Sequence, residues 1–140
     1  MSGFRAPVYQ RIVPDGVAWS DRITFSPAVR VGDFIYVSGL TATDDQHRIV
    51  GVGDIVAQTR QIFAKMARIL AAAGAGMEHV VETTDYFISL EDYSRTAEVR
   101  REVFHGPPYP AATGVRVAGL IRPEALIEIK AVAICPKASP

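Results

Sequence analysis

The sequence predicts an α+β domain in which two helices pack on one face of a mixed β-sheet. One long segment, residues 55–73, has the apolar spacing of an amphipathic helix. Several shorter runs are rich in β-branched and aromatic residues, as strands are. Strand-like and helical segments alternate in the middle of the chain, and apolar strand pairs lie near both ends. With 140 residues, 49% of them hydrophobic, we expect one soluble domain, 1–140, with one core.

The first third of the chain predicts an edge strand, a hairpin and a loop. Residues 1–22 hold scattered apolar residues and prolines, and residues 8–13 are expected to form an edge strand. Two apolar runs, 28–31 and 34–37, flank Gly32 and Asp33, a pair typical of a hairpin turn. Residues 41–53 are polar and contain several glycines, which favours an exposed loop.

Two helices and a strand are predicted in the middle of the chain. Asp54 precedes the periodic segment and is a good N-cap for a helix over 55–73, which Gly74 would end. Residues 80–88 predict a strand. A second helix over 91–104 would turn Tyr93, Ala97, Val103 and Phe104 inward before Gly106-Pro107-Pro108 ends it.

Residues 110–134 predict two apolar strands joined by a short turn near Ile121 and Arg122, in an antiparallel hairpin. In the second strand, alternation puts Glu128 on the face opposite Ile127 and Ile129. An ionised carboxylate in an apolar sheet is costly unless it is paired, exposed at an interface or functional. The hairpin would also place Arg116 opposite Glu128. A loose tail is expected over 136–140.

The charge balance and the rare residue types exclude several kinds of protein. Fifteen basic and fifteen acidic residues give no net charge, so binding to nucleic acid is not expected. A single cysteine, Cys135, fits a reducing compartment, and no apolar run is long enough for a membrane span or signal peptide, so we expect a cytoplasmic protein. The three histidines lack the spacing of metal ligands, and we expect neither a metal nor a cofactor.

Helices on one side of the sheet would leave its other side, rich in Val, Ile and Phe, uncovered. In so short a chain the best cover for such a face is another copy of the same chain. The sequence therefore predicts an oligomer.

Four stretches together resemble the Rid/YjgF family of small trimeric proteins. They are AVRVGDFIYVSGL at 28–40, GDIVAQTRQIF at 53–63, VVETTDYFISLEDY at 80–93 and YPAATGVRVAGLIRPEALIEIKAVAI from 109. The resemblance implies a chorismate-mutase-like fold, a homotrimer and a small-molecule ligand at the subunit interface. The best-known members of this family hydrolyse reactive 2-imino and enamino acids to 2-keto acids and ammonia.

The resemblance also implies a set of site residues, of which this chain keeps only some. Glu128 matches the residue thought to hold the attacking water, and Ser38 and Gly39 match the family's VSG motif. The arginine that binds the substrate carboxylate is replaced by Ala112, next to Thr113, and alanine cannot make that contact. The other departures are Phe25 for a tyrosine, Ala97 for an asparagine and Gly114 for a cysteine. Glu128 is thus the catalytic candidate, and Gly114 would widen the cleft.

Arg116 offers a compensation for the missing guanidinium, and arginines of the second predicted helix offer a separate basic rim. Arg116 lies on the same face as Ala112 but about 13 Å along the strand, so a cross-strand ion pair with Glu128 is the preferred interpretation. Arg95, Arg100 and Arg101 on the second helix would form a basic rim for an anionic ligand. The more common arrangement is a solvated face on which arginines alternate with Glu98 and Glu102.

The leading functional hypothesis is a hydrolase that acts on an imine, an enamine or a related metabolite in an intersubunit cleft. Typical 2-imino acid deamination is not expected, because Ala112 replaces the arginine. The alternative is a non-catalytic metabolite-binding or regulatory module on the same trimeric scaffold. Cleavage of RNA, reported for some members of the family, is disfavoured by the zero net charge.

Overall fold

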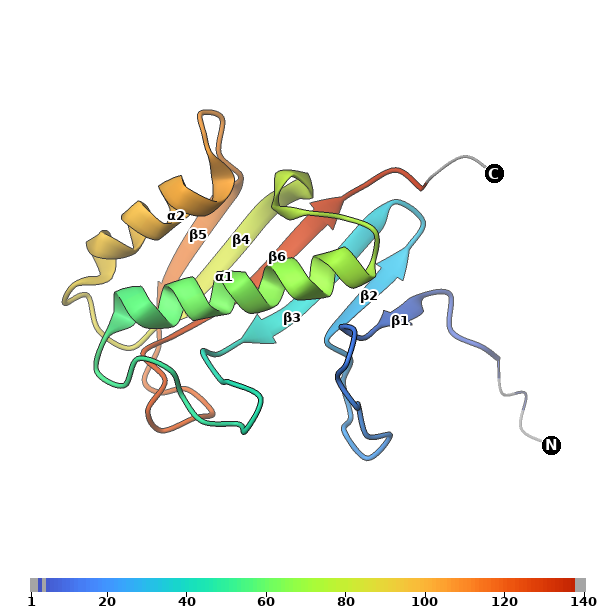
Figure 1. Ribbon diagram of the computed structural model, residues 1–140, viewed down its shortest axis with the longest axis horizontal. Coiled ribbons are helices and arrows are strands. Elements are labelled where there is room, and N and C mark those ends of the chain that lie inside the picture. The colour runs from blue at the N-terminus through green and yellow to red at the C-terminus, as the bar shows by residue number, and fades with distance from the viewer. Residues whose placement is uncertain (1–2, 4, 138–140) are drawn as a thin grey trace.

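The computed structural model describes residue 3 and residues 5–137, and it contains one six-stranded sheet. The strands are β1 (Gln10–Ile12), β2 (Ala28–Val31), β3 (Phe34–Leu40), β4 (Val80–Phe87), β5 (Ala111–Arg116) and β6 (Ile127–Ile134), in the spatial order β1-β2-β3-β6-β4-β5. Helices α1 (Ile55–Ala72) and α2 (Thr96–Phe104) cover one face of the sheet (Figure 1). The predicted fold class is confirmed. Residues 138–140 of the predicted tail, and residues 1, 2 and 4 of the N-terminal segment, lie outside the described residues.

Helix α1 forms the centre of the core and agrees with its prediction to within one residue. The Asp54 carboxylate accepts a hydrogen bond from the backbone N–H of Ala57 at 3.0 Å, and Gly74 follows the helix at φ +79°. Its inner face buries Ile62, Phe63, Met66 and Leu70 against buried sheet residues, among them Ile35, Ile127 and Ile129. None of the helices in the described part of the chain is long and apolar enough to cross a membrane.

The N-terminal strands are arranged as the sequence predicts. β2 and β3 pair in antiparallel register across Gly32, which has φ +58° in the turn. β1 lies at the edge of the sheet and pairs with β2, but it covers only three residues of the predicted 8–13.

The two C-terminal strands are not neighbours, so the predicted hairpin over 110–134 is wrong. β5 pairs with β4 in parallel at the outer edge, whereas β6 lies between β3 and β4 and is antiparallel to both. β6 alternates buried with less buried positions, which suits the centre of the sheet, while all six residues of β5 are exposed. Residues 117–126 therefore form a crossing connection instead of a tight turn.

The second helical segment starts later than the sequence predicts. Asp92 adopts φ +60°, a short 3₁₀ helix η2 (Tyr93–Arg95) follows, and α2 begins only at Thr96. A residue in the left-handed region cannot continue a right-handed helix, which delays the start. Val99 is the most buried residue of α2, while Ala97 is only half-buried.

Gln58 connects α1 to the start of β6. Its side chain is fully buried; its amide nitrogen donates to the carbonyl oxygens of Gly51 and Glu124, each at 3.1 Å. Its amide oxygen accepts from the backbone N–H of Leu126 at 2.8 Å. Since Leu126 lies two residues before Glu128, these three hydrogen bonds fix the position at which the strand carrying Glu128 begins.

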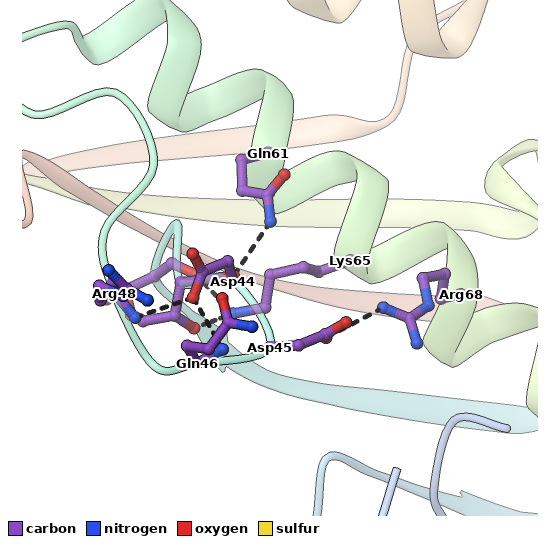
Figure 2. A network of polar contacts seen from close by, with 9 residues as sticks. Asp44, Asp45, Gln46, Arg48, Gln61, Lys65 and Arg68 are labelled. Carbon is purple, nitrogen blue, oxygen red and sulfur yellow. Dashed lines mark hydrogen bonds and ion pairs between the residues drawn. The ribbon is translucent and has the colours of Figure 1, made fainter. Parts of the chain in front are cut away.

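Hydrogen bonds from side chains of α1 hold the loop over 41–53 in place, which the sequence did not predict. Figure 2 shows Lys65 and Gln61 reaching from the helix to this loop. The Lys65 ammonium donates to the carbonyl oxygen of Thr41 at 2.7 Å and to the hydroxyl of Thr43 at 2.6 Å. Gln61 donates to the carbonyl oxygen of Thr43 at 3.0 Å. Most of the loop is exposed or half-buried, as expected, but Ala42 is fully buried.

Candidate functional site

Glu128 lies on the open face of the sheet, the face away from the two helices. Its neighbours Ile127 and Ile129 are fully buried under the helices, so strand alternation turns the half-buried Glu128 the other way. Its carboxylate lies directly over Gly39, where any side chain would collide with Oε2 of Glu128. Within the described residues this carboxylate has neither a hydrogen bond nor an ion pair. Because Gly39 has no side chain, the Glu128 carboxylate can pack against its backbone. The carboxylate oxygens can still accept hydrogen bonds from a ligand or water.

Ser38 precedes Gly39 on β3 and so lies near Glu128, whereas Phe25 lies in the segment before β2. The Ser38 hydroxyl donates to the carbonyl oxygen of Ser26 at 2.6 Å, which is the structural use of a serine at a strand irregularity. Phe25 is 59% exposed, and its ring meets Trp19 edge-on at 5.5 Å between centroids. A cavity of about 240 Å³ opens on this face; its lining includes Ser26, Tyr36, Ser38, Thr84 and Lys130.

The β5 candidates belong to a different surface. Register places Ala112, Gly114 and Arg116 beside Thr83, Asp85 and Phe87 of β4, whose side chains are buried on the helix side of the sheet. Thr113 instead shares the open face with Thr84. Within one chain, therefore, Glu128, Ser38, Gly39 and Thr113 lie on one face, and Ala112, Gly114 and Arg116 on the other.

The predicted ion pair between Arg116 and Glu128 is wrong. Arg116 is level with Phe87 on the edge strand, whereas Glu128 is level with Tyr86 on the central β6. Strand β4 separates them, and their side chains leave opposite faces of the sheet. The ion pair was predicted from a hairpin over 110–134, and this hairpin does not form.

Gly114 does not widen a cleft, because Tyr93 fills the space beside it. A Cβ atom at Gly114 would lie 2.8 Å from the Tyr93 hydroxyl oxygen and 3.3 Å from the Phe87 ring. The Tyr93 hydroxyl donates to Oδ2 of Asp85 at 2.9 Å, and the rings of Tyr93 and Phe87 stack at 3.9 Å. The glycine accommodates a packed tyrosine, and the expected extra room is absent.

Asp85 is a buried acid that the sequence interpretation missed. Its side chain is 4% exposed, and its Oδ1 atom has no hydrogen-bond partner in the described structure. Burial raises the pKa of Asp85, although the Tyr93 hydroxyl and the nearby Arg100 act in the opposite direction. Burial, together with Asp85, raises the pKa of Tyr93. Alternation along 80–88 groups Asp85 with Thr83 and Phe87, and this pattern was available in the sequence.

The arginines of the second helical segment do not form a common rim. Arg95 and Arg101 are exposed, while Glu102 binds Arg60 of α1 through two hydrogen bonds of 2.9 and 3.2 Å. Arg100 is half-buried and turns toward the sheet, where its Nη1 atom donates to the Thr83 hydroxyl at 3.0 Å. Its guanidinium carbon also lies 5.2 Å from the centroid of the Phe104 ring.

Comparison with known proteins gives consistent matches over most of the chain. Residues 18–135 match the model of the endoribonuclease L-PSP family. A RutC family protein of Pyrococcus abyssi is 37% identical over 109 residues, which cover 78% of this chain and 84% of the relative. The 3-aminoacrylate deaminase RutC of Acinetobacter baylyi is 34% identical over 122 residues, covering 87% of this chain and 94% of the relative.

Solved structures give the same result for the fold. The crystal structure of RidA from the Antarctic bacterium Psychrobacter sp. PAMC 21119 superposes with a TM-score of 0.79 at 29% identity, covering 89% of this chain and 98% of that one. An endoribonuclease-like protein of Thermotoga maritima superposes with a TM-score of 0.80 at 30% identity, covering 93% and 98%. The arrangement of sheet and helices is therefore shared with these proteins.

Proposed function

The chain belongs to the endoribonuclease L-PSP family, the Rid/YjgF proteins, and from this premise we propose that it hydrolyses a small imine or enamine to a carbonyl compound and ammonia. The observation that carries the proposal is the position of Glu128. Its carboxylate lies over Gly39 on the open face of the sheet, and none of the described residues neutralises it. A relative at 34% identity is named 3-aminoacrylate deaminase, and this name supports an enamine as the substrate class.

The chemistry requires a group that takes a proton from water. In the proposed reaction, water attacks the carbon of the C=N bond while Glu128 accepts one of its protons. Glu128 returns that proton to the nitrogen, which gives a carbinolamine with a hydroxyl and an amino group. Glu128 then takes the hydroxyl proton and passes it to the amino nitrogen as the C–N bond breaks, so that ammonia leaves and a C=O group remains. An enamine reaches the same path after its β-carbon is protonated. The cytoplasm, predicted from the sequence, is where such metabolites would be met.

The site requires a second copy of the chain. Among the predicted site residues on the strands, Glu128, Ser38, Gly39 and Thr113 lie on the open face and Ala112, Gly114 and Arg116 lie on the helix side, so the sheet itself separates the two groups within one chain. Packing of one chain's β5 edge against the open face of another would join them. This supports the predicted homotrimer with its ligand at the subunit interface, and the exposed aromatic side chains of the open face support it as well.

The test is ammonia release by a Glu128→Gln variant. The main substrate is 3-aminoacrylate. Freshly generated 2-aminoacrylate and 2-iminobutyrate are assayed beside it, and they should be poor substrates because Ala112 replaces the arginine. Glu128→Gln keeps the size of the side chain and removes its basicity, so we expect a loss of roughly 10²–10⁴-fold in kcat/KM. Glu98→Gln, at an exposed position of α2, is the matched control and should behave as the parent.

Two outcomes would contradict the proposal. Full activity of Glu128→Gln would show that another group activates the water. Binding of the carbonyl product that persists in both variants, with no turnover of any of the three substrates, would favour the alternative of a non-catalytic binding module.

A further inference from the structure

Tyr86 is a tyrosine of the open face whose side chain lies outside the buried core. Its strand neighbours Asp85 and Phe87 are buried on the helix side of the sheet, so alternation along β4 turns Tyr86 to the face that carries Glu128. The Tyr86 side chain is half-buried and has no place in the core under the helices. Tyr86 therefore contributes to the surface of the open face.

Strand register places Tyr86 directly beside Glu128. The two residues are opposite each other on the antiparallel strands β4 and β6. The Cβ atoms of such a pair lie about 4.5–5.5 Å apart. On the other side of β6, the Glu128 carboxylate lies over Gly39 of β3, so it turns away from Tyr86. The carboxylate and the tyrosine thus border a common space on the open face.

The hydroxyl of Tyr86 can bind a ligand. Among the described residues it has no hydrogen-bond partner, and the one buried side-chain polar atom of these residues that lacks a partner is Oδ1 of Asp85. The Tyr86 hydroxyl therefore reaches the surface. Ser38, the other hydroxyl residue near Glu128, donates its proton to the carbonyl oxygen of Ser26 at 2.6 Å. Tyr86 is thus the residue that offers a free donor beside Glu128.

We propose that the Tyr86 hydroxyl donates a hydrogen bond to the oxygen atom that water brings to the substrate carbon. The inference rests on the proposed function and adds a second catalytic residue to it. A water molecule held between Glu128 and Tyr86 has its oxygen in contact with both side chains. When Glu128 takes the hydroxyl proton of the carbinolamine, negative charge develops on that oxygen, and the hydrogen bond from Tyr86 stabilises this charge until the C=O group forms. Tyr86 keeps its own proton throughout, so the proton balance of the reaction is unchanged.

The first test is the kinetics of Tyr86→Phe, which removes the hydroxyl and keeps the ring. With 3-aminoacrylate as substrate, kcat should fall roughly 10²-fold while KM changes little, because this hydrogen bond strengthens as charge develops on the oxygen. The pH profile of kcat should keep its shape, because Tyr86 transfers no proton. Tyr9→Phe, at an exposed tyrosine just before β1, is the matched control and should behave as the parent. Circular dichroism and light scattering check that both variants fold and assemble as the parent does.

A second test detects the hydrogen bond without turnover. The probe is acetoacetate labelled with ¹³C at its keto carbon, which carries a carbonyl group where the product of 3-aminoacrylate hydrolysis would have one. The stretching frequency of a carbonyl group falls when its oxygen accepts a hydrogen bond. In the infrared spectrum, the band of acetoacetate bound to the parent should therefore lie at a lower frequency than the band of acetoacetate bound to Tyr86→Phe. Tyr9→Phe should give the band of the parent.

The outcomes separate this inference from the proposed function. Hydrolysis that depends on Glu128 but proceeds with the parent's kcat in Tyr86→Phe would refute the inference and leave the proposed function standing. The same holds if Tyr86→Phe raises KM alone, or if the acetoacetate band has one position in the parent and in Tyr86→Phe. A band that shifts with Tyr86, in a protein that hydrolyses none of the three substrates, would support the inferred contact and refute the proposed function.

Discussion

Tyr93, Asp85 and Gly114 form one packing unit, and each explains the residue type found at the other two positions. The buried Asp85 carboxyl needs a donor, and the Tyr93 hydroxyl supplies it at 2.9 Å. That hydroxyl lies beside Gly114 of β5, where a Cβ atom would approach it to 2.8 Å, so the glycine leaves room for the contact. The sequence predicts that Gly114 widens a cleft. In the structure Gly114 instead leaves space for the hydrogen bond between Tyr93 and Asp85, which lies on the neighbouring strand β4.

Gly114→Cys should consequently destabilise the protein. The new Cβ would meet the Tyr93 hydroxyl oxygen at 2.8 Å, so the tyrosine must move and its hydrogen bond to Asp85 must stretch or break. Overpacking of this kind costs about 1–3 kcal/mol in the free energy of unfolding. Urea unfolding of the parent and the variant measures it. In a Tyr93→Phe background the same change should cost less, because the obstructing hydroxyl is gone; an equal cost in both backgrounds would contradict the steric explanation.

At the scale of elements, the loop over 41–53 is fixed to α1 mainly through Lys65. Figure 2 shows its ammonium between the loop and the helix, with Asp45 and Arg68 forming a more exposed contact of 3.6 Å nearby. Burial lowers the pKa of Lys65 to about 8, and the positive charge of Arg122 acts in the same direction. The contact therefore holds the loop at the expense of burying a charged amine.

Two effects follow for the stability of Lys65→Met. At pH 7 the loss of the hydrogen bonds to Thr41 and Thr43 should cost about 1–2 kcal/mol in the free energy of unfolding. Between pH 8 and 10.5, the value of a free lysine, the unfolded chain retains a proton on this amine that the folded chain has released. Rising pH in that window therefore favours the folded parent, and its stability advantage over Lys65→Met should grow.

Urea unfolding at pH 7, 8, 9 and 10 measures this difference. Lys137→Met, at an exposed lysine, controls for general effects of pH on the chain and should show no such trend. An advantage of the parent that shrinks as the pH rises would mean that the hydrogen bonds of the charged amine outweigh its burial.

The C-terminal strands show why pairing is harder to predict than elements. Residues 111–116 and 127–134 are both strands, close to the predicted segments, yet the sequence favoured a direct hairpin because a short connection containing Pro123 is typical of a turn. The order strand, helix, strand over β4, α2 and β5 is the pattern of a parallel crossover, which competes with a hairpin for β5. Burial decides between the crossover and the hairpin. The apolar inner side of β6 is buried at the centre of the sheet, whereas the residues of β5 are exposed at its edge.

For the whole molecule, local patterns predicted most of the elements of the fold and the face of the sheet on which Glu128 lies, while the role of each site residue stays a prediction. The cap at Asp54, the turn at Gly32 and the exit of Glu128 on one face of its strand depend on near neighbours in sequence, and all three agree with the structure. The inward turn of Arg100 and the separation of Ala112 from Glu128 depend on which strands pair, which local patterns do not determine.

The separation of Ala112 from Glu128 within one chain bears on how the chains assemble. The open face of one chain exposes 44% of Phe34, 46% of Tyr36 and 39% of Ile134, an apolar surface that a second copy would cover in the proposed trimer. Tyr36→Glu would place a charge in that interface without touching the buried core. Light scattering should then show the mass of one chain for this variant and, as we propose, the mass of three chains for the parent, with the same circular dichroism spectrum for both. Ala64→Glu, an equal change on the exposed side of α1, should stay trimeric. Hydrolysis should disappear with the trimer, because Glu128 would lose the β5 edge that completes its site; a monomer that still hydrolyses the substrate would place the whole reaction on one chain.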